Sequence, residues 1–404
     1  MTEIANTPEL RFPNYENSWF SYKLNDISER VTRKNKNLES QRPLTISGQL
    51  GLIDQIEYFN KSVSSKNLTG YTLIKKGEFA YNKSYSNGYP LGAIKKLERY
   101  DLGILSSLYI CFSFDENIDK SFMKNYFEST KWYREVANIA VEGARNHGLL
   151  NIPVNDFFNI NINLPIQYEQ EKIGEFFSKL DCQIELEEQK LAKLEEQKKG
   201  YMQQIFSQQL RFKDANGNEY PEWEEKKLGD ILERGNKDKV NEIGKYRRLT
   251  ISLHGKGLYE VKQERKTKDT RPFYQRFEGE LIIGKQNFFN GSIAIVTREF
   301  NGFICSNAIM SYKISNHMNR TYLLEYLLQN DFLRKNEYLA DGTGQKELSE
   351  KKFEELEIKL PNSINEQQKI GVFLERLDNL IEKQSNKLEL LKQRKKSFLQ
   401  KMFV

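Results

Sequence analysis

Apolar residues recur at alternating steps of four and three along two stretches of the chain, residues 169–206 and 366–403. This spacing predicts an α-helix whose apolar stripe forms the seam of a coiled coil. At a rise of about 1.5 Å per residue, each helix would be roughly 55 Å long. The predicted seam consists of Ile173, Phe177, Leu180, Ile184, Leu191, Leu194, Tyr201, Ile205, Ile370, Leu374, Leu377, Ile381, Leu388, Leu391, Phe398 and Met402.

Polar residues interrupt the two seams at matching places, Glu187 and Lys198 in the first stretch and Gln384 and Lys395 in the second. Polar seam positions usually fix register and orientation at some cost in stability. The two stretches are copies, because a shift of 197 residues aligns them without a gap. A repeat of this length indicates a duplicated architecture.

The two copies differ in charge. Counting Lys and Arg against Asp and Glu gives −3 for residues 166–210 and +4 for residues 365–404. Opposite charges favour pairing of the two helices with each other over pairing of either with itself. We therefore predict an intramolecular, antiparallel coiled coil; the alternative is two separate helices that each cover their own domain.

The repeat is circular. The sequence LRF follows the first stretch at Leu210, and the LRF that would follow the second stretch stands at Leu10, near the start of the chain. The N- and C-termini are therefore expected to lie close together. Trp19 and Trp223 occupy matching positions after these segments, and we expect both to pack in a domain core rather than to stack on bases.

Between the long stretches, the two halves of the chain keep a common order of β-like and helical segments. LTIS occurs at Leu44 and Leu249, and GEFAYNKS at Gly77 parallels GELIIGKQ at Gly279. Short, mixed strands and helices predict two α+β domains of one fold. The expected order is a first domain (1–165), a first spacer helix (166–209), a second domain (210–363) and a second spacer helix (364–404).

Gly174 and Gly371 lie early in the two predicted helices. Glycine inside a helix costs about 1 kcal/mol relative to alanine. Its presence in both copies indicates close approach by a neighbouring domain or by a partner subunit.

Composition excludes several classes of protein. Among the 404 residues no apolar run is long enough to cross a bilayer, the N-terminus lacks a signal-peptide pattern, and the three cysteines are scattered. We expect a cytoplasmic protein. The net charge of +6 permits binding to nucleic acid.

No catalytic or metal site is predicted. GELIIGKQ lacks the Ser or Thr that a phosphate-binding loop needs after its lysine, and the chain has no GxGxxG, HExxH or adenine-methylase motif. The histidines His147, His254 and His317 have no metal-ligand spacing. The chain is therefore not expected to be an enzyme.

Loops rich in basic, amide and tyrosine residues are the best candidates for binding DNA. Lys and Arg suit phosphates, whereas Arg, Asn and Gln can also read base edges. The candidates are Arg33, Lys34, Lys36, Lys83, Tyr85, Asn87, Arg145, Asn146, Arg247, Arg248, Arg265, Lys266, Lys268, Arg271, Lys285, Gln286, Asn287, Gln345 and Lys346. Any one of them is as easily an ordinary solvated side chain, so the clusters carry more weight than their members.

These features resemble the specificity (S) subunit of Type I restriction-modification systems over essentially the whole chain. The most specific elements are EQxKIGxFxxxLD at Glu169 and Glu366, and KK(G/S)(Y/F)(M/L)Q at Lys198 and Lys395. The closing strands at Leu164-Pro165 and Leu360-Pro361, NKSYSNGYPLGA from Asn82 and GARNHGLLNIP from Gly143 are also similar to segments of that family.

The resemblance implies two target-recognition domains that bind a split target in double-stranded DNA, with the spacer helices setting the distance between its parts. It implies a non-catalytic chain on which two modification subunits assemble to methylate adenine N6 with S-adenosylmethionine. Restriction subunits that use ATP and Mg would join them.

Because the two halves differ in their loops, we expect an asymmetric target. The alternative is a coiled-coil scaffold with two protein-binding modules and no DNA role.

Overall fold

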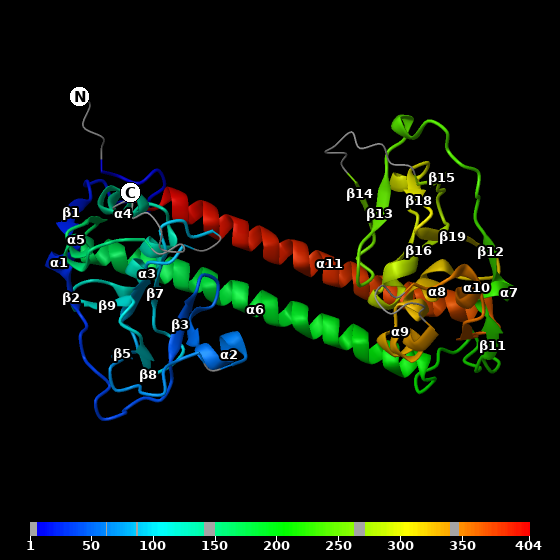
Figure 1. Cartoon of the computed structure of the whole chain (residues 1–404), viewed down its shortest axis with the longest axis horizontal. Helices are drawn as coiled ribbons and strands as arrows, with labels where there is room; N and C mark the ends of the chain where they lie inside the picture. Colours follow the sequence, from blue (N-terminus) through cyan, green and yellow to red (C-terminus); the bar gives the residue numbers. More distant parts are fainter. Residues whose placement is uncertain (1–5, 62, 86–87, 141–149, 262–270, 340–346) are drawn as a thin grey trace. The chain divides into compact units, whose positions relative to one another are not determined.

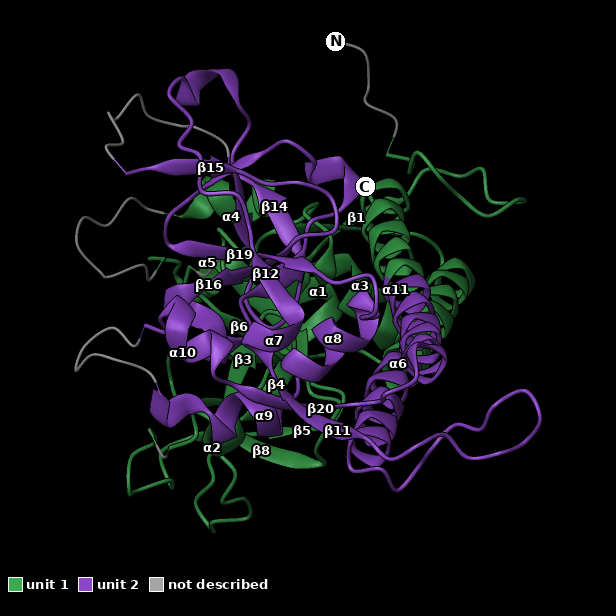
Figure 2. Ribbon diagram, turned by 90° about the vertical axis from the view of Figure 1, so that its right-hand side faces the viewer, with its two compact units in different colours: residues 1–189, 386–404 green, residues 190–385 purple. Residues whose placement is uncertain are grey.

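A computed structural model describes residues 6–61, 63–85, 88–140, 150–261, 271–339 and 347–404. The chain divides into two compact units. Unit 1 consists of residues 1–189 and 386–404, and unit 2 of residues 190–385 (Figure 2). Each unit contains one α+β half and part of each of the two long helices (Figure 1).

Unit 1 is built around an antiparallel four-stranded sheet of order β2-β9-β6-β7, joined by the two-stranded sheets β1-β10, β3-β4 and β5-β8. Its strands are β1 (Phe20–Lys23), β2 (Ser28–Arg30), β3 (Leu44–Ser47), β4 (Gly51–Asp54), β5 (Thr72–Lys75), β6 (Phe79–Asn82), β7 (Ala93–Lys96), β8 (Leu102–Leu105), β9 (Tyr109–Phe114) and β10 (Asn161–Leu164). Its short helices are α1 (Leu24–Ile27), α2 (Gln55–Phe59), α3 (Lys120–Glu128), α4 (Tyr133–Ile139) and α5 (Val154–Phe158).

Unit 2 repeats this topology, with a sheet of order β12-β19-β16-β17 and the pairs β11-β20, β13-β14 and β15-β18. Its strands are β11 (Glu224–Lys227), β12 (Leu232–Arg234), β13 (Leu249–Ile251), β14 (Leu258–Glu260), β15 (Phe273–Gln275), β16 (Leu281–Gly284), β17 (Ile293–Ile295), β18 (Ile304–Ser306), β19 (Ile309–Ile314) and β20 (Glu357–Leu360). Its short helices are α7 (Leu228–Ile231), α8 (Arg320–Leu327), α9 (Asn330–Lys335), α10 (Glu350–Glu354) and the 3-10 helices η1 (Ile243–Lys245), η2 (Lys285–Asn290), η3 (Arg298–Phe300) and η4 (Glu337–Leu339). The prediction of two α+β halves of one fold is confirmed.

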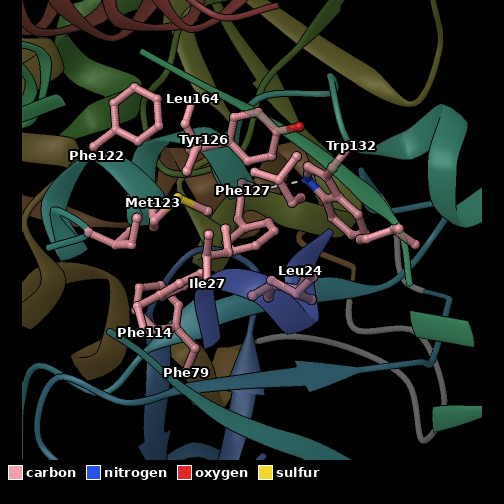
Figure 3. Packing of buried hydrophobic residues seen from close by; sticks show 14 of the residues in the cluster. Leu24, Ile27, Phe79, Phe114, Phe122, Met123, Tyr126, Phe127, Trp132 and Leu164 are labelled. Atoms are coloured by element: carbon pink, nitrogen blue, oxygen red, sulfur yellow. Dashed lines mark hydrogen bonds between the residues drawn. The ribbon is translucent and has the colours of Figure 1, made fainter. Parts of the chain in front are cut away.

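The core of unit 1 lies between its sheet and helices α3 to α5 and is rich in aromatic rings (Figure 3). Phe79 stacks against Phe112 with ring centroids 5.7 Å apart, and the buried Trp132 donates its indole N–H to the carbonyl of Phe127 at 3.1 Å. Trp19 is buried against Phe122 and Phe403, as expected for a core residue. Trp223 packs half-buried against Tyr322 in unit 2.

The two long helices are α6 (Gln167–Phe206) and α11 (Ile364–Lys401). In unit 1, Asp181 of α6 forms an ion pair with Lys395 of α11 at 2.6 Å, and Glu188 pairs with Lys392 at 2.6 Å. Residue numbers rise along α6 as they fall along α11, so the two segments are antiparallel. In unit 2, Lys198 pairs with Asp378 at 2.7 Å, which gives the same direction and register.

The polar interruptions of the predicted seam are used for pairing. Glu187 forms an ion pair with Lys387, Lys395 pairs with Asp181, and Lys198 lies between Asp378 and Glu325. Within each unit, α6 and α11 therefore pack together, as predicted for an intramolecular pair.

The beginning of the chain lies against the end of α11. The backbone N–H of Leu10 donates to the carbonyl of Lys401 at 2.9 Å, and the Lys401 ammonium group pairs with Glu9 at 2.7 Å. The expected proximity of the two ends of the chain is confirmed for these residues. Across the described ranges, every helix is too short or too polar to span a membrane.

Candidate nucleic-acid interface

In unit 1, the turn between β3 and β4 contacts the segment that follows β6. The hydroxyl of Tyr89 donates to the carbonyl of Gly48 at 2.7 Å, and the Lys95 ammonium group lies 5.0 Å from the centre of the Tyr89 ring. Burial, reinforced by the nearby Glu128 carboxylate, raises the pKa of Tyr89 to about 12, so its hydroxyl stays a donor at neutral pH. Tyr89 therefore fastens the two turns together.

Unit 2 brings the equivalent turns together by backbone bonds. His254 and Gly255, between β13 and β14, donate their N–H groups to the carbonyls of Asn290 and Gly291 at 2.8 and 2.9 Å. His254 has a φ of 59°, a left-handed conformation that is uncommon outside glycine. We call residues 48–50 with 83–85 and 88–91 in unit 1, and 252–257 with 285–291 in unit 2, the turn surfaces.

Several predicted DNA-binding residues lie on the turn surfaces. Tyr85 is 61% exposed, Gln286 and Asn287 are exposed, and Lys83 and Lys285 are half-buried. The two lysines occupy matching places. The carbonyl of Lys83 accepts a hydrogen bond from Leu150 at 2.9 Å, and that of Lys285 accepts one from Leu348 at 3.0 Å. In each unit, the lysine carbonyl on the turn surface thus also holds a leucine, Leu150 in unit 1 and Leu348 in unit 2.

Other predicted residues are engaged within the fold. Arg33 donates to the carboxylate of Glu78 at 2.6 Å, and Lys34 donates to the carbonyl of Gly70 at 3.0 Å. Arg247 pairs with Glu260, which raises the pKa of its guanidinium group, and it lies over the ring of Phe303. These contacts favour a structural role for Arg33 and Arg247 in the free protein.

Three further candidates lie outside the turn surfaces. The Arg248 guanidinium carbon is 4.5 Å from the centre of the Phe273 ring. Lys36 and Arg271 are exposed. The predicted residues Asn87, Arg145, Asn146, Arg265, Lys266, Lys268, Gln345 and Lys346 lie outside the described residues.

The structure adds residues that the sequence analysis did not select. Leu50, 49% exposed, and Leu253, 41% exposed, stand at the two hairpin tips, and His254 and Lys256 are exposed beside Leu253. The recurrence of LTIS before each hairpin was the available signal, because the residues directly after a repeated strand form the matching turn in both halves. Unit 2 has the more basic turn surface of the two.

The predicted seam residues divide by burial. Those that are buried are Ile173, Phe177, Ile205, Ile370, Leu374, Leu388, Leu391 and Met402. Those that are half-buried are Leu180, Ile184, Leu191, Leu194, Leu377, Ile381 and Phe398. Tyr201 is 39% exposed and its ring contacts that of Phe373, with centroids 5.1 Å apart.

Unit 2 also contains a cavity of about 840 Å³ beside the turn surface. It is bordered by α6, α8, α9 and the hairpin residues His254 to Lys256. At its base, Lys198 lies 3.0 Å from Glu325 and 2.7 Å from Asp378. Among the described residues, no group of three or more His, Cys, Asp or Glu side chains could hold a metal ion.

Comparison with known proteins agrees with this arrangement. Residues 220–393 match the family described as Type I restriction modification DNA specificity domain. The chain is 28% identical over 217 residues to the putative type I restriction enzyme MjaX specificity subunit of Methanocaldococcus jannaschii. That alignment covers 49% of this chain and 49% of the relative, so the match spans about half of its length.

Solved structures show the same fold. The Type I restriction-modification S subunit from M. genitalium superposes with a TM-score of 0.58 at 16% identity, over 98% of this chain and 99% of that chain. A chain from a structural study of complex assembly and conformational transition of the type I R-M system gives a TM-score of 0.53 at 16% identity, over 95% and 97%.

Two α+β halves of one topology, each joined to antiparallel segments of two long helices, are the fold that the chain shares with these solved structures. Residues 220–393 are thus similar to the DNA specificity domain of Type I restriction-modification systems, and the chain shares its fold with the solved S subunit from M. genitalium.

Proposed function

We propose that this chain binds a bipartite, asymmetric target in double-stranded DNA, with the turn surface of each unit reading one part. The proposal is carried by one observation. The two units share a topology and have a turn surface at the same place in it, but the side chains of the two turn surfaces differ. Unit 1 presents Tyr85 and Leu50, whereas unit 2 presents His254, Lys256 and Gln286. Different side chains at the same place in the fold favour different bases, and hence an asymmetric target.

The long helices support a spacer role. At 40 and 38 residues, α6 and α11 exceed the length of one turn of DNA, since a helix of this size is roughly 60 Å long and a DNA turn about 34 Å. A chain with two equivalent halves can address two half-sites as a dimer does.

The assembly partners in this proposal are two modification subunits, which would methylate adenine N6 with S-adenosylmethionine. Restriction subunits that use ATP and Mg would join them. The match of residues 220–393 to the Type I restriction modification DNA specificity domain supports this choice of partners.

Mapping of N6-methyladenine in cells that express the chain with a modification subunit tests the proposal. The expected result is two short, different sequences separated by a fixed gap of unspecified bases. Replacing His254 and Gln286 together by alanine is expected to relax one part of that target only, and Tyr85→Ala the other part only. Asn316→Ala, at an exposed position in the loop before α8, is the control and should leave the target unchanged. A contiguous or palindromic target would contradict the proposal.

Salt titration separates this function from that of a protein-binding scaffold. Phosphate contacts make the logarithm of DNA affinity fall linearly with the logarithm of salt concentration, with a slope near −0.9 per contact. The assembled complex is expected to show a steep slope. Absence of sequence-dependent DNA binding at low salt would favour the scaffold instead.

A further inference from the structure

Two glutamines, 197 residues apart, link the start of each long helix to its own α+β half. Gln170 on α6 donates from Nε2 to the carbonyl of Pro165 at 3.0 Å and accepts at Oε1 from the N–H of Asp119 at 3.1 Å. On α11, Gln367 donates to the carbonyl of Pro361 at 2.9 Å and accepts from the N–H of Asn319 at 2.9 Å. Their exposed fractions are 3% and 1%. The nitrogen of each buried amide donates a hydrogen bond and its oxygen accepts one, and together the two bonds fix the side chain in one orientation.

The residues that the glutamines hold are the N-caps of domain helices. Asp119 Oδ1 accepts from the N–H of Phe122 at 2.6 Å at the start of α3, and Asn319 Oδ1 accepts from the N–H of Tyr322 at 2.9 Å at the start of α8. Helices α3 and α8 contribute buried side chains to the two main cores. Each glutamine therefore connects its long helix directly to a rigid part of the domain.

The two helix glycines lie one turn beyond the glutamines. A Cβ atom on Gly174 would lie 2.4 Å from Asp119 Oδ1 and 3.0 Å from the backbone nitrogen of Phe122. On Gly371 it would lie 2.5 Å from Asn319 Oδ1 and 3.2 Å from Asn319 Cγ, with the Cβ of Thr321 at 3.4 Å. The close approach predicted from the glycines is thus made by the domain's own N-cap, which explains why both helices tolerate the cost of about 1 kcal/mol.

We propose that Gln170 with Gly174, and Gln367 with Gly371, are positioning residues that fix the direction in which each recognition half leaves its long helix. In doing so they set the gap between the two parts of the DNA target. This inference rests on the proposed function. Changing the gap by one base pair moves a half-site by about 3.4 Å and turns it by about one tenth of a helical turn, so a stiff joint is needed to tell neighbouring gaps apart.

The experiment uses the full chain assembled with its modification subunits and a series of duplexes that carry both parts of the methylated target. The gap is varied by one and two base pairs in each direction. Wild type is expected to prefer one gap. In Gln367→Ala and Gln170→Ala, the ratio of affinities between the best gap and its neighbours is expected to fall about tenfold, the effect of losing a buried hydrogen-bonded joint.

Exposed neighbours on the same helices provide matched controls. Gln368→Ala and Gln167→Ala remove exposed glutamines from the first turns of α11 and α6 and should keep the wild-type ratio. Binding to a duplex with only one part of the target should change little in any variant, because the turn surfaces are untouched. A wild-type ratio in a folded Gln367→Ala protein would overturn the inference.

A second pair of variants keeps the inference testable if the glutamine variants do not fold. Gly371→Ala should weaken the gap preference, and Gly371→Ala with Asn319→Ser should restore it, because only the Asn319 side chain is in the way and serine still caps a helix. The matching pair Gly174→Ala with Asp119→Ser should not be restored, since the backbone of Phe122 also obstructs that Cβ. A folded Gly371→Ala protein that keeps the wild-type gap preference would overturn the inference. A wild-type complex that binds all gaps equally would instead overturn the proposed function, and the inference with it.

Discussion

The guanidinium group of Arg11 makes two hydrogen bonds of 2.7 Å to the carboxylate of Glu169, 158 positions later in the chain. The Glu169 side chain is 1% exposed and that of Arg11 14%. Arg211 and Glu366 repeat the pair in unit 2, with their closest contact at 3.2 Å. These pairs tie the segment leading into each domain to the first turn of a long helix. The two Arg–Glu pairs explain why the repeated EQxKIGxF pattern contains Glu. The contacts with the N-cap residues Asp119 and Asn319 explain why it contains Gln and Gly.

Arg11→Ala is expected to destabilise unit 1 by about 3 kcal/mol, because it leaves the Glu169 carboxylate buried without a partner. Hydrogen exchange of peptides from unit 1, with peptides from unit 2 as the internal reference, measures the loss. Replacing both partners, as in Arg11→Met with Glu169→Leu, should cost less than Arg11→Ala alone. Arg134→Ala, at a side chain that is 82% exposed, is the control; an Arg11→Ala effect no larger than the control effect would contradict this prediction.

The cluster of Lys198, Glu325 and Asp378 predicts a pH dependence of stability in unit 2. Burial, together with the neighbouring Asp378 carboxylate, raises the pKa of Glu325 even though Lys198 opposes the shift. A carboxyl group with a raised pKa in the folded state contributes stability below its unfolded pKa, near 4.5, and loses that contribution as the pH rises through the folded value.

Glu325→Gln removes this titration. The variant should gain free energy of unfolding relative to wild type as the pH rises above about 4.5, since it no longer buries a charge. Chemical unfolding at a series of pH values measures the difference. Glu375→Gln, at an exposed position on α11, should show a flat difference. A flat profile for Glu325→Gln would show that Lys198 compensates fully for burial of its charge.

Lys256 and Tyr85 should affect DNA binding in different ways. Lys256→Ala is expected to lower the salt slope of the assembled complex by about 1, which is the loss of one phosphate contact. Tyr85→Ala should weaken binding with little change in slope, because an exposed aromatic ring acts through stacking or base contact. Lys359→Ala on β20, away from the turn surface and 3.6 Å from Glu225, is the control. A slope change in the Tyr85 or Lys359 variant as large as that in the Lys256 variant would contradict this assignment.

The fold was largely predictable because its strongest signal is internal to the sequence. The repeat and the spacing of the seam residues predicted two paired helices. The position of the second LRF, at Leu10 near the start of the chain, predicted that the two ends lie close together. The partners of the polar seam residues were not predictable in this way. Lys198 meets Glu325, 127 positions away and on a domain helix, and no periodicity along α6 indicates that contact.

The candidate DNA-binding residues were harder to predict for a related reason. Composition selects arginines in loops, but it does not show that Arg33 already pairs with Glu78, 45 positions away. Conversely, the hairpin tip at His254 looks like an ordinary glycine-rich turn until its backbone bonds to Asn290 and Gly291 place it beside Gln286. Tertiary contacts between segments far apart in the sequence decide in both cases which side chains lie close together.

Charge exchange across the helix pair tests how the two long helices recognise each other in unit 1. Lys395→Glu should destabilise the pair strongly, because it places a carboxylate against Asp181, where the lysine now lies at 2.6 Å with side chains only 21% and 29% exposed. The double variant with Asp181→Lys should recover part of the loss. Recovery should be incomplete, because Lys124 also faces Asp181 at 3.4 Å and would then meet a lysine.

The exposed pair of Glu188 and Lys392 is the matched comparison, with side chains 48% and 47% exposed at the same distance of 2.6 Å. Exposed ion pairs contribute about 0 to 1 kcal/mol, so exchanging these two charges should change stability by less than that. Thermal unfolding with hydrogen exchange of peptides from α6 and α11 measures both exchanges. Equal effects at the two pairs would show that burial does not govern helix pairing. Full recovery in the Asp181 and Lys395 exchange would show that Lys124 takes no part in it.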